Sequence, residues 1–271
     1  MQTAFRDLNS SPDPKIMGIV NLTPDSFYDG GRYPNYASVV SDVSDKIKAG
    51  ADWIDVGAQS TRPNSQPVSL TEELERLQVL NEVRSAFPDQ LMSLDTYNSV
   101  VARNAIELYG INMINDVSGL SDPEMISLIN EFRIPYVLTF SENRLNRIKS
   151  EDQNPEKLIT RMLDFFKSML SQLPEELIVL DPGFGFNKSL NDNFVILKHL
   201  ERIKPLGRPI LVGLSRKRMV YEPLNGYPTS ALNGSTALHA IALWNGAGIL
   251  RVHDVKEACE TRLLIENLKR V

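Results

Sequence analysis

The stretch LIVLDPG (residues 177–183) shows the pattern that decides the fold of this 271-residue chain: an apolar run that ends in a polar residue. Seven more such runs are KIMGIV (15–20), DWIDVG (52–57), LMSLD (91–95), INMIND (111–116), PYVLTF (135–140), PILVGLS (209–215) and GILRVHD (248–254). Short runs rich in Ile, Val and Leu are typical of strands that are buried on both faces. The sequence therefore predicts eight strands of a parallel sheet.

Longer segments between these runs have the spacing of amphipathic helices. Such patterns cover residues 36–51, 69–87, 98–110, 154–170 and 254–270. In the first of them, Val39, Val43 and Ile47 recur every four residues, as on one face of a helix. Thr71 is the predicted N-cap of the second helix, and Asp254 is a cap-type residue at the start of the last one.

Strand and helix alternate eight times over roughly 250 residues, which favours a single-domain α/β protein with a (β/α)₈ TIM-barrel fold. We expect the barrel to span residues 15–271, after an N-terminal extension at residues 1–14. A doubly wound open sheet also alternates strands and helices. Its usual G-x-G-x-x-G after the first strand is absent here, so the barrel is the preferred prediction.

Composition excludes several classes of protein. The chain is 42% hydrophobic and 23% charged, with a net charge of −5 and a pI near 5.4, which argues against a general nucleic-acid binder. One cysteine, Cys259, allows no internal disulfide, so we expect a cytoplasmic protein. The N-terminal residues lack the apolar core of a secretion signal, and no apolar run is long enough to span a membrane.

Polar side chains stand at the end of nearly every predicted strand. They are Asn21, Asp55, Asp95, Asn115 with Asp116, Thr139, Asp181, Ser215 with Arg216 and Lys217, and Arg251 with His253. In a TIM barrel these strand ends meet on one face, which carries the active site. Single positions have a plainer interpretation: Asp55 and Asp116 could cap helices, and Arg216 could be a surface charge.

These residues sort into two kinds of chemistry. Cations and donors that suit phosphate oxygens are Thr61, Arg62, Ser215, Arg216, Lys217, Arg251 and His253. Asp95, Asn115 and Asp181 are acceptors that suit the N–H groups of a flat heterocycle with an amino-pyrimidinone edge. Together the two sets predict a heterocyclic diphosphate as ligand. The glycine-rich segment YDGGR (28–32) is either a loop that closes over this site or an ordinary turn.

Seven segments, in order and spacing, resemble the motifs of the dihydropteroate synthases. They are IMGIVNLTPDSFYDGG, IDVGAQSTRP, SLDTY, INDVSGL, LDPGFGF, VGLSRK and GILRVHD, which together span residues 16–254. The resemblance implies a transferase of folate biosynthesis on a TIM barrel, and a target of sulfonamides. Its reaction joins 6-hydroxymethyl-7,8-dihydropterin diphosphate to 4-aminobenzoate by an SN1-like mechanism and releases pyrophosphate. A homodimer with Mg²⁺ as cofactor is also implied.

The same resemblance implies a role for each matching residue. Asp95, Asn115, Asp181 and Lys217 match the positions that bind the pterin. Asn21, which is also the metal position, and Thr61, Arg62, Arg251 and His253 match those that bind the diphosphate. Phe27, Asp29, Phe186 and Ser215 match the 4-aminobenzoate side. The catalytic set is then Asn21, Arg62, Asp95, Lys217, Arg251 and His253. Arg251, as an anion ligand, is expected to matter for turnover and little for stability.

Two departures from the bacterial pattern concern the pterin side. Thr139, in VLTFSENR (137–144), stands where many members carry an apolar methionine, and Asn187-Lys188 replaces the usual Gly-Lys. Two rival functions stay open. One is a pterin-dependent methyltransferase that hands a methyl group to a corrinoid, against which the diphosphate cluster counts. The other is a relative that binds pterins without turnover.

Overall fold

The computed structural model describes residues 13–22, 35–59, 68–141 and 154–271, and its described strands form one parallel sheet. The strands are β1 (Lys15–Asn21), β2 (Trp53–Gly57), β3 (Leu91–Asp95), β4 (Met113–Asp116), β5 (Tyr136–Thr139), β6 (Ile178–Asp181), β7 (Leu211–Val212) and β8 (Ile249–Val252). Seven of them lie within one of the apolar runs, and β1 extends one residue beyond its run, to Asn21. The eight predicted strands are therefore confirmed.

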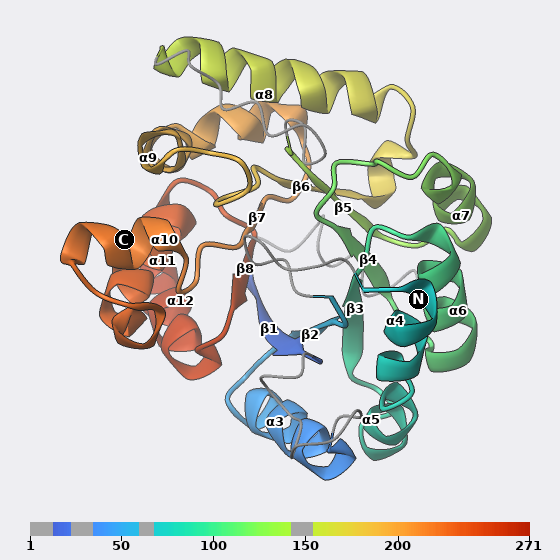
Figure 1. The fold of residues 1–271 in the computed structure, drawn as a ribbon. Helices are drawn as coiled ribbons and strands as arrows, with labels where there is room; N and C mark the ends of the chain where they lie inside the picture. Colours follow the sequence, from blue (N-terminus) through green and yellow to red (C-terminus); the bar gives the residue numbers. More distant parts are fainter. Residues whose placement is uncertain (1–12, 23–34, 60–67, 142–153) are drawn as a thin grey trace.

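The sheet curves into a barrel. Its order is β6-β5-β4-β3-β2-β1-β8-β7, so the two ends of this order are β6 and β7. An isolated parallel bridge between Leu180 and Ile210 joins these ends, and the Leu180 N–H donates to the Pro209 carbonyl at 2.9 Å. Figure 1 looks into the ring of strands, with the helices outside it. The TIM barrel is confirmed, and the open doubly wound sheet is excluded.

Helices follow the strands as the alternation predicts. They are α3 (Tyr36–Lys48), α4 (Leu70–Leu77), α5 (Leu80–Ala86), α6 (Ser99–Tyr109), α7 (Glu124–Phe132), α8 (Pro155–Leu170), α9 (Leu190–Lys198), α10 (Arg218–Tyr221), α11 (Leu232–Trp244) and α12 (Val255–Arg270). In α3 the side chain of Asn35 caps the first turn, and Val39 and Val43 are buried against the barrel.

One predicted helix start is wrong. Ser69, not Thr71, caps α4, since its hydroxyl accepts from the Glu72 N–H at 3.2 Å. The single helix predicted over residues 69–87 is also two helices, α4 and α5, separated at Gln78 and Val79. The sequence pattern missed this break because apolar residues continue across it with helical spacing.

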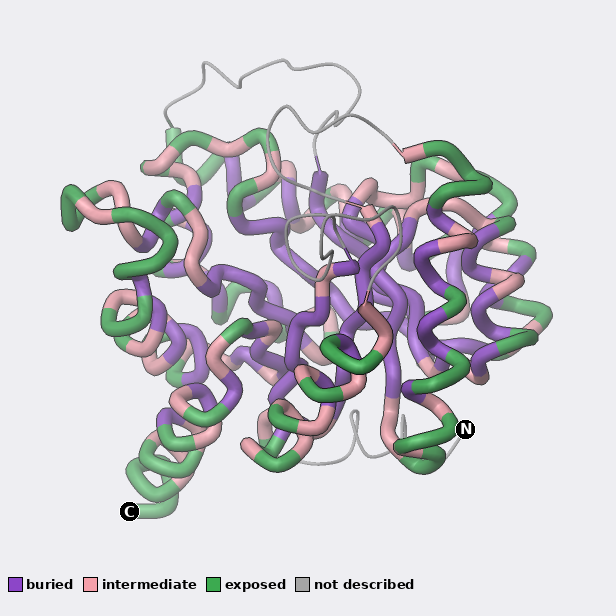
Figure 2. The backbone as a smooth tube through the Cα atoms, turned by 60° about the horizontal axis from the view of Figure 1, so that its bottom comes forward, coloured by how far each residue is buried: buried purple, intermediate pink, exposed green. Residues whose placement is uncertain are grey.

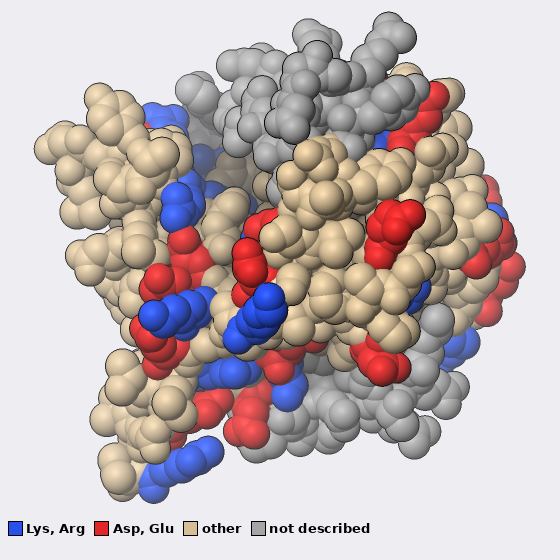
Figure 3. Space-filling view, turned by 90° about the horizontal axis from the view of Figure 1, so that it is seen from below, with Lys and Arg blue, Asp and Glu red and all other residues tan. Residues whose placement is uncertain are grey.

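Burial follows the two layers of the fold. Figure 2 shows the strands and the inner sides of the helices as buried, and the outer sides of the helices as exposed. The buried apolar side chains include Trp53, Tyr136 and Phe166. On the face drawn in Figure 3, acidic and basic side chains are interspersed and form no patch of a single sign. Among the described residues, no helix is long and apolar enough to cross a membrane.

Candidate active site

Side chains at the C-terminal ends of the strands point into the barrel. Arg251 on β8 reaches Asp55 on β2 and Asp95 on β3, and Asn115 on β4 also reaches Asp55. Because β8, β2 and β4 are not neighbours in the sheet, these hydrogen bonds cross the barrel interior. Strand registers pair Asn21 with Gly57, Gly57 with Asp95, Asp95 with Asn115, Asn115 with Val137, and Thr139 with Asp181. Register partners share a face and alternate residues share a face, so Asn21, Asp95, Asn115, Thr139 and Asp181 all face inward.

Asp55, which the sequence analysis assigned to no substrate, contacts two of the predicted ligand residues. It is fully buried, and its Oδ2 accepts from Arg251 Nε at 2.6 Å and from Asn115 Nδ2 at 3.1 Å. The sequence signal for Asp55 was its place on the inward-facing side of a strand. An aspartate near a strand end is also a common helix cap. In the structure Asp55 caps no helix; it holds two of the predicted ligand residues in place.

Arg251 is bound by two carboxylates. Its Nη2 lies 2.8 Å from Asp95 Oδ2, in addition to the bond with Asp55. Burial opposes the charge of the guanidinium, but Asp55 and Asp95 outweigh it, so the pKa of Arg251 is raised. The structure changes the expectation that Arg251 matters little for stability. Removal of its charge would leave two buried carboxylates without their counter-ion.

Lys217 and Asp181 form the other charged part of the site. Lys217 Nζ donates to the Phe184 carbonyl at 2.5 Å and lies 4.4 Å from the centroid of the Phe186 ring. Burial lowers the pKa of Lys217 to about 8, although the carboxylate of Asp181 opposes the shift. Burial also raises the pKa of Asp181, against the opposing charge of Lys217. The structure therefore brings together Lys217 and Phe186, which the resemblance assigned to different substrates.

The loop after β6 is fixed by a glycine and a lysine. Gly183 has φ +71°, and a Cβ there would lie 2.3 Å from the Phe140 carbonyl oxygen, so only glycine fits. Lys188 Nζ donates to the carbonyls of Phe140, at 2.8 Å, and of Gly183, at 2.9 Å. Asn187 takes a positive φ of 50°, a conformation that asparagine tolerates. At the departure Asn187-Lys188, this chain has a positive-φ residue followed by a lysine that anchors the loop.

His253 lies beside Ser215. Its Nδ1 is 3.1 Å from Ser215 Oγ, and its backbone N–H donates to the same oxygen at 3.2 Å. The residue is open to solvent, yet desolvation by the surrounding protein and the charge of Arg251 lower the pKa of His253 to about 4. The lowered pKa favours the neutral imidazole at pH 7, and the tautomer sets whether Nδ1 donates to or accepts from Ser215 Oγ. Ser215 contacts a residue of the predicted diphosphate group.

Two arginines of the segment after β7, Arg216 and Arg218, both pair with acids. Arg216 Nε and Nη2 bind the carboxylate of Asp254 at 2.9 and 2.6 Å. Arg218 pairs with Glu222 one turn later on the exposed surface. Asp254 precedes α12 as predicted, but its side chain binds Arg216 and caps no backbone N–H. The guanidinium of Arg216 is thus held by an acidic neighbour, and its place among the predicted phosphate donors stays a prediction.

Asp116 also lies outside the site. Its Oδ2 accepts from the Tyr136 hydroxyl at 2.5 Å, and its Oδ1 accepts from the Ser118 N–H at 2.7 Å. Burial raises the pKa of Asp116, opposed by these hydrogen bonds. Asp116 closes the turn after β4 and caps no helix.

A buried polar network supports the ends of β2 and β3. Glu73 on α4 is 1% exposed and accepts from Gln59 Nε2 at 2.6 Å and from Thr96 Oγ1 at 2.9 Å. The Tyr97 hydroxyl donates to Gln59 Oε1 at 3.0 Å. Burial raises the pKa of Glu73 despite these bonds. The network fixes the backbone that immediately follows Asp95.

The space beside Asn21 has one suitable metal ligand. A Cβ built on Gly57 would lie 3.6 Å from Asn21 Oδ1 and 3.8 Å from Asp95 Cγ, so the missing side chain opens a cradle between them. Among the described residues, no three His, Cys, Asp or Glu side chains cluster to form a metal cage. The amide oxygen of Asn21 fits Mg²⁺, which often binds through few protein ligands and substrate phosphates.

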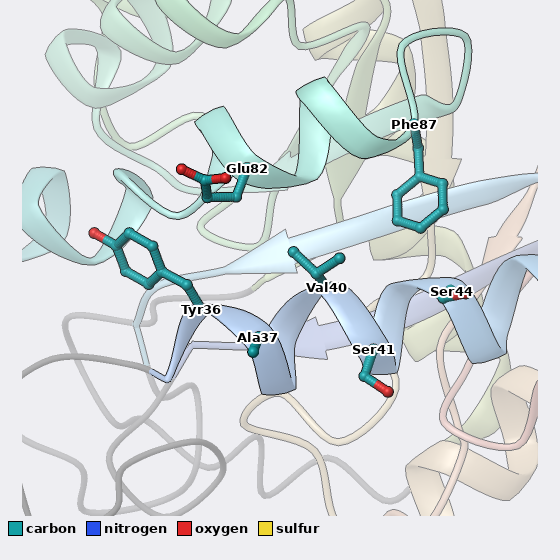
Figure 4. A pocket seen from close by; sticks show the side chains of 7 residues that line it. All are labelled: Tyr36, Ala37, Val40, Ser41, Ser44, Glu82 and Phe87. Atoms are coloured by element: carbon teal, nitrogen blue, oxygen red, sulfur yellow. The ribbon is translucent and has the colours of Figure 1, made fainter.

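Four assigned residues lie outside the described residues: Phe27, Asp29, Thr61 and Arg62. A hollow of about 520 Å³ lies elsewhere, between α3 and α5 on the outside of the barrel. Figure 4 shows Val40 of α3 directed toward the α5 side, which contributes Glu82, with Phe87 after it. No strand-end residue lines this hollow, so we assign the active site to the barrel end.

Comparison with known proteins agrees with this geometry. Residues 17–253 match the model of the pterin-binding enzyme family. The dihydropteroate synthase of Streptococcus pyogenes is 39% identical, over 93% of this chain and 95% of that protein. The structure of the Xanthomonas albilineans dihydropteroate synthase with 4-aminobenzoic acid superimposes with a TM-score of 0.86, at 34% identity, over 96% of this chain and 94% of that one. The Clostridium difficile dihydropteroate synthase, solved in the presence of pteroic acid, gives a TM-score of 0.87, at 35% identity, over 96% and 98%. The chain thus belongs to the pterin-binding enzyme family, within its dihydropteroate synthases.

Proposed function

We propose that the inward-facing side chains at the end of this barrel carry out the family's condensation of a pterin diphosphate with 4-aminobenzoate. The observation that carries the proposal is the inward-facing row of Asp95, Asn115 and Asp181, with Arg251 and Lys217 beside it. Acceptors in a row suit the N–H groups of a pterin, and the cations suit the charge of its diphosphate. The ligands held by the two solved relatives are one substrate and a pterin-containing acid.

The pterin is assigned to Asp95, Asn115, Asp181 and Lys217. Asn115 and Asp181 are 1% and 5% exposed, so a ring bound there is removed from water. Electrostatic interactions strengthen in such an environment. Phe186, under Lys217, provides a flat apolar surface for the aromatic ring of 4-aminobenzoate, together with Phe27, Asp29 and Ser215 from the family pattern.

The step itself is a dissociative substitution. The C–O bond between the pterin methylene and the diphosphate breaks first, and the bonding electrons leave with the pyrophosphate. The carboxylates of Asp95 and Asp181 stabilise the cation that remains on the pterin. The amine of 4-aminobenzoate then donates its lone pair to the methylene carbon and loses a proton to solvent. No residue needs to activate this neutral nucleophile; the protein supplies charge and position.

The leaving pyrophosphate is assigned to Arg251 and His253, and to Thr61 and Arg62 from the family pattern. Arg251 shares its charge with Asp55 and Asp95, so it is already oriented when the substrate arrives. Asn21 would hold Mg²⁺ beside Gly57. When bound there, Mg²⁺ would neutralise phosphate oxygens.

A pyrophosphate-release assay tests the proposal. We expect release that requires both substrates and Mg²⁺. Release with the pterin diphosphate alone would indicate hydrolysis and not condensation. No release above background, with pterin binding intact by calorimetry, would favour a pterin-binding relative without turnover. Methyl transfer to a corrinoid, measured by the change in its visible spectrum, would favour the methyltransferase alternative.

We further propose that the protein acts as a homodimer in the cytoplasm. Exposed apolar side chains gather on the neighbouring helices α11 and α12: Ile241, Trp244, Leu263, Leu264 and Leu268, each at least 45% exposed. Exposed apolar patches of this kind mark interaction sites. Trp244→Glu should convert the dimer into a monomer in light scattering; a wild-type monomer would contradict the proposal. The cytoplasm is inferred from the single cysteine.

A further inference from the structure

The hydroxyl of Thr139 is buried without a hydrogen-bond partner. Thr139 ends β5 and is 0% exposed, and its Oγ1 has no partner among the described residues. Buried hydroxyls nearly always have a partner, because desolvation without a compensating hydrogen bond costs free energy. This orphan hydroxyl therefore requires an explanation.

The neighbours of Thr139 place its hydroxyl beside the pterin row, the inward-facing residues Asp95, Asn115 and Asp181 that are assigned to the pterin. Thr139 is the register partner of Asp181 and lies two residues beyond Val137, the partner of Asn115. Alternation along β5 therefore turns Thr139 into the barrel, on the same face as Asn115 and Asp181. A Cβ placed on Gly183 would lie 3.1 Å from Thr139 Cγ2, so the methyl group packs against the glycine loop.

A second orphan atom lies on the adjacent strand. The Oδ1 of Asn115 is buried and also without a partner among the described residues, whereas its Nδ2 is bound to Asp55. Two unpartnered polar atoms on neighbouring strands, facing the same interior, have one common explanation: a ligand that brings both a donor and an acceptor. A hydroxyl can accept from a ring N–H and donate to a ring nitrogen or carbonyl.

We propose that Thr139 determines specificity for the pterin by a direct hydrogen bond from its hydroxyl to the heterocycle, between Asn115 and Asp181. The proposal rests on the assignment of this row to the pterin. It adds a polar contact from β5 to those from β4 and β6. The pterin ring then meets hydrogen-bonding side chains from three consecutive strands.

Two matched variants test this contact. Thr139→Val keeps the shape and removes the hydroxyl, while Thr139→Ser keeps the hydroxyl and removes the methyl group. We would measure the Kd of the pterin diphosphate by calorimetry in the absence of the second substrate, the Michaelis constant for 4-aminobenzoate, and the Tm of the free protein. Thr139→Val should raise the pterin Kd about three- to tenfold. It should leave the Michaelis constant for 4-aminobenzoate unchanged and raise the Tm by about 2–4 °C, since a buried orphan is removed.

The combination of weaker binding and higher Tm is the signature of a ligand contact. Thr139→Ser should keep the wild-type pterin Kd. An unchanged Kd in Thr139→Val would overturn the proposal, and so would a lower Tm, which would mean that the hydroxyl has a partner within the protein. Asp181→Asn serves as reference: if it also leaves the Kd unchanged, the assignment of the pterin row fails, and not the role of Thr139 alone.

Discussion

The two ends of the barrel differ in how their buried polar groups are paired. At the N-terminal end, Arg262 binds the Pro14 carbonyl at 3.1 Å and Asp52 Oδ2 at 2.7 Å, and Asp52 also accepts from the Ile16 N–H. Arg84 donates to four backbone carbonyls near the starts of β3 and β4. These side chains join the starts of neighbouring strands, although the buried Nε of Arg208, before β7, has no partner among the described residues.

The C-terminal end and the strand interiors leave polar atoms unpaired. Within the described residues, the buried side-chain oxygens without a partner are those of Asp55 (Oδ1), Ser93, Asn115 (Oδ1), Thr139 and Ser141. All lie in a strand or directly after β5. Unpaired buried groups cost stability, so the unpaired oxygens of Asn115 and Thr139, at the C-terminal ends of their strands, indicate a place where a ligand supplies the partner. The opposite end stabilises the fold.

Replacement of Arg251 should have the largest effect on the C-terminal end, because it removes the charge partner of two buried carboxylates. Arg251→Met leaves Asp55 and Asp95 buried without their counter-ion, which should lower the free energy of unfolding by about 3–5 kcal/mol. Urea denaturation measures this loss, and turnover should disappear. The double variant Arg251→Met/Asp55→Asn should recover part of the stability. A loss below about 1 kcal/mol would mean that the pair contributes little.

Asp181→Asn should affect binding more than folding. We expect the pterin Kd to rise about 10- to 100-fold, because a charged acceptor is lost. Calorimetry with the pterin diphosphate measures it. The matched variant Asp192→Asn, in the capping box of α9, should leave the Kd unchanged. Equal effects of the two changes would argue against a specific role for Asp181.

Gln59→Glu should destabilise the buried polar network that holds the ends of β2 and β3. It places a second carboxylate against Glu73, whose pKa burial already raises, and should cost about 1–3 kcal/mol at pH 8. The folded-state pKa of the pair lies above the unfolded value, so the loss grows as the pH rises and shrinks toward pH 5. Urea denaturation at both pH values measures this dependence. The exchange Gln59→Glu/Glu73→Gln should restore stability; failure to do so would argue against the charge explanation.

The pterin affinity should fall as the pH rises through about 8. Lys217 has a pKa of about 8 and loses its charge there, so the Kd should rise about tenfold between about pH 7 and 9. Lys217→Met should bind weakly at all these pH values, with a flat profile. Parallel profiles of the two proteins would assign the titration to another group.

Arg262→Met, at the N-terminal end, should have the smallest effect. The ion pair with Asp52 is partly exposed, so the loss should be about 1 kcal/mol or less. Pyrophosphate release should keep its wild-type rate, and urea denaturation measures the stability. A loss of activity without a loss of stability would contradict the division between the two ends.

Much of the site could be predicted because it depends on local pattern. Apolar runs that end in polar residues located all eight strands, and their alternation placed Asp95, Asn115 and Asp181 on one face. Helix ends were harder, as Thr71 and Ser69 show, since several residues near a helix start can cap it. The break between α4 and α5 could not be predicted, because the helical spacing of apolar residues continues across it.

The sequence by itself determined the order of the elements and the inward direction of the strand-end side chains, because the two-residue period of a strand is local. Only the tertiary structure decided which charges meet. Arg251 pairs with Asp55 across a separation of 196 residues, and Arg216 pairs with Asp254. The orphan hydroxyl of Thr139 is likewise a tertiary result. Partner choice depends on distances across the closed barrel, which no local pattern contains.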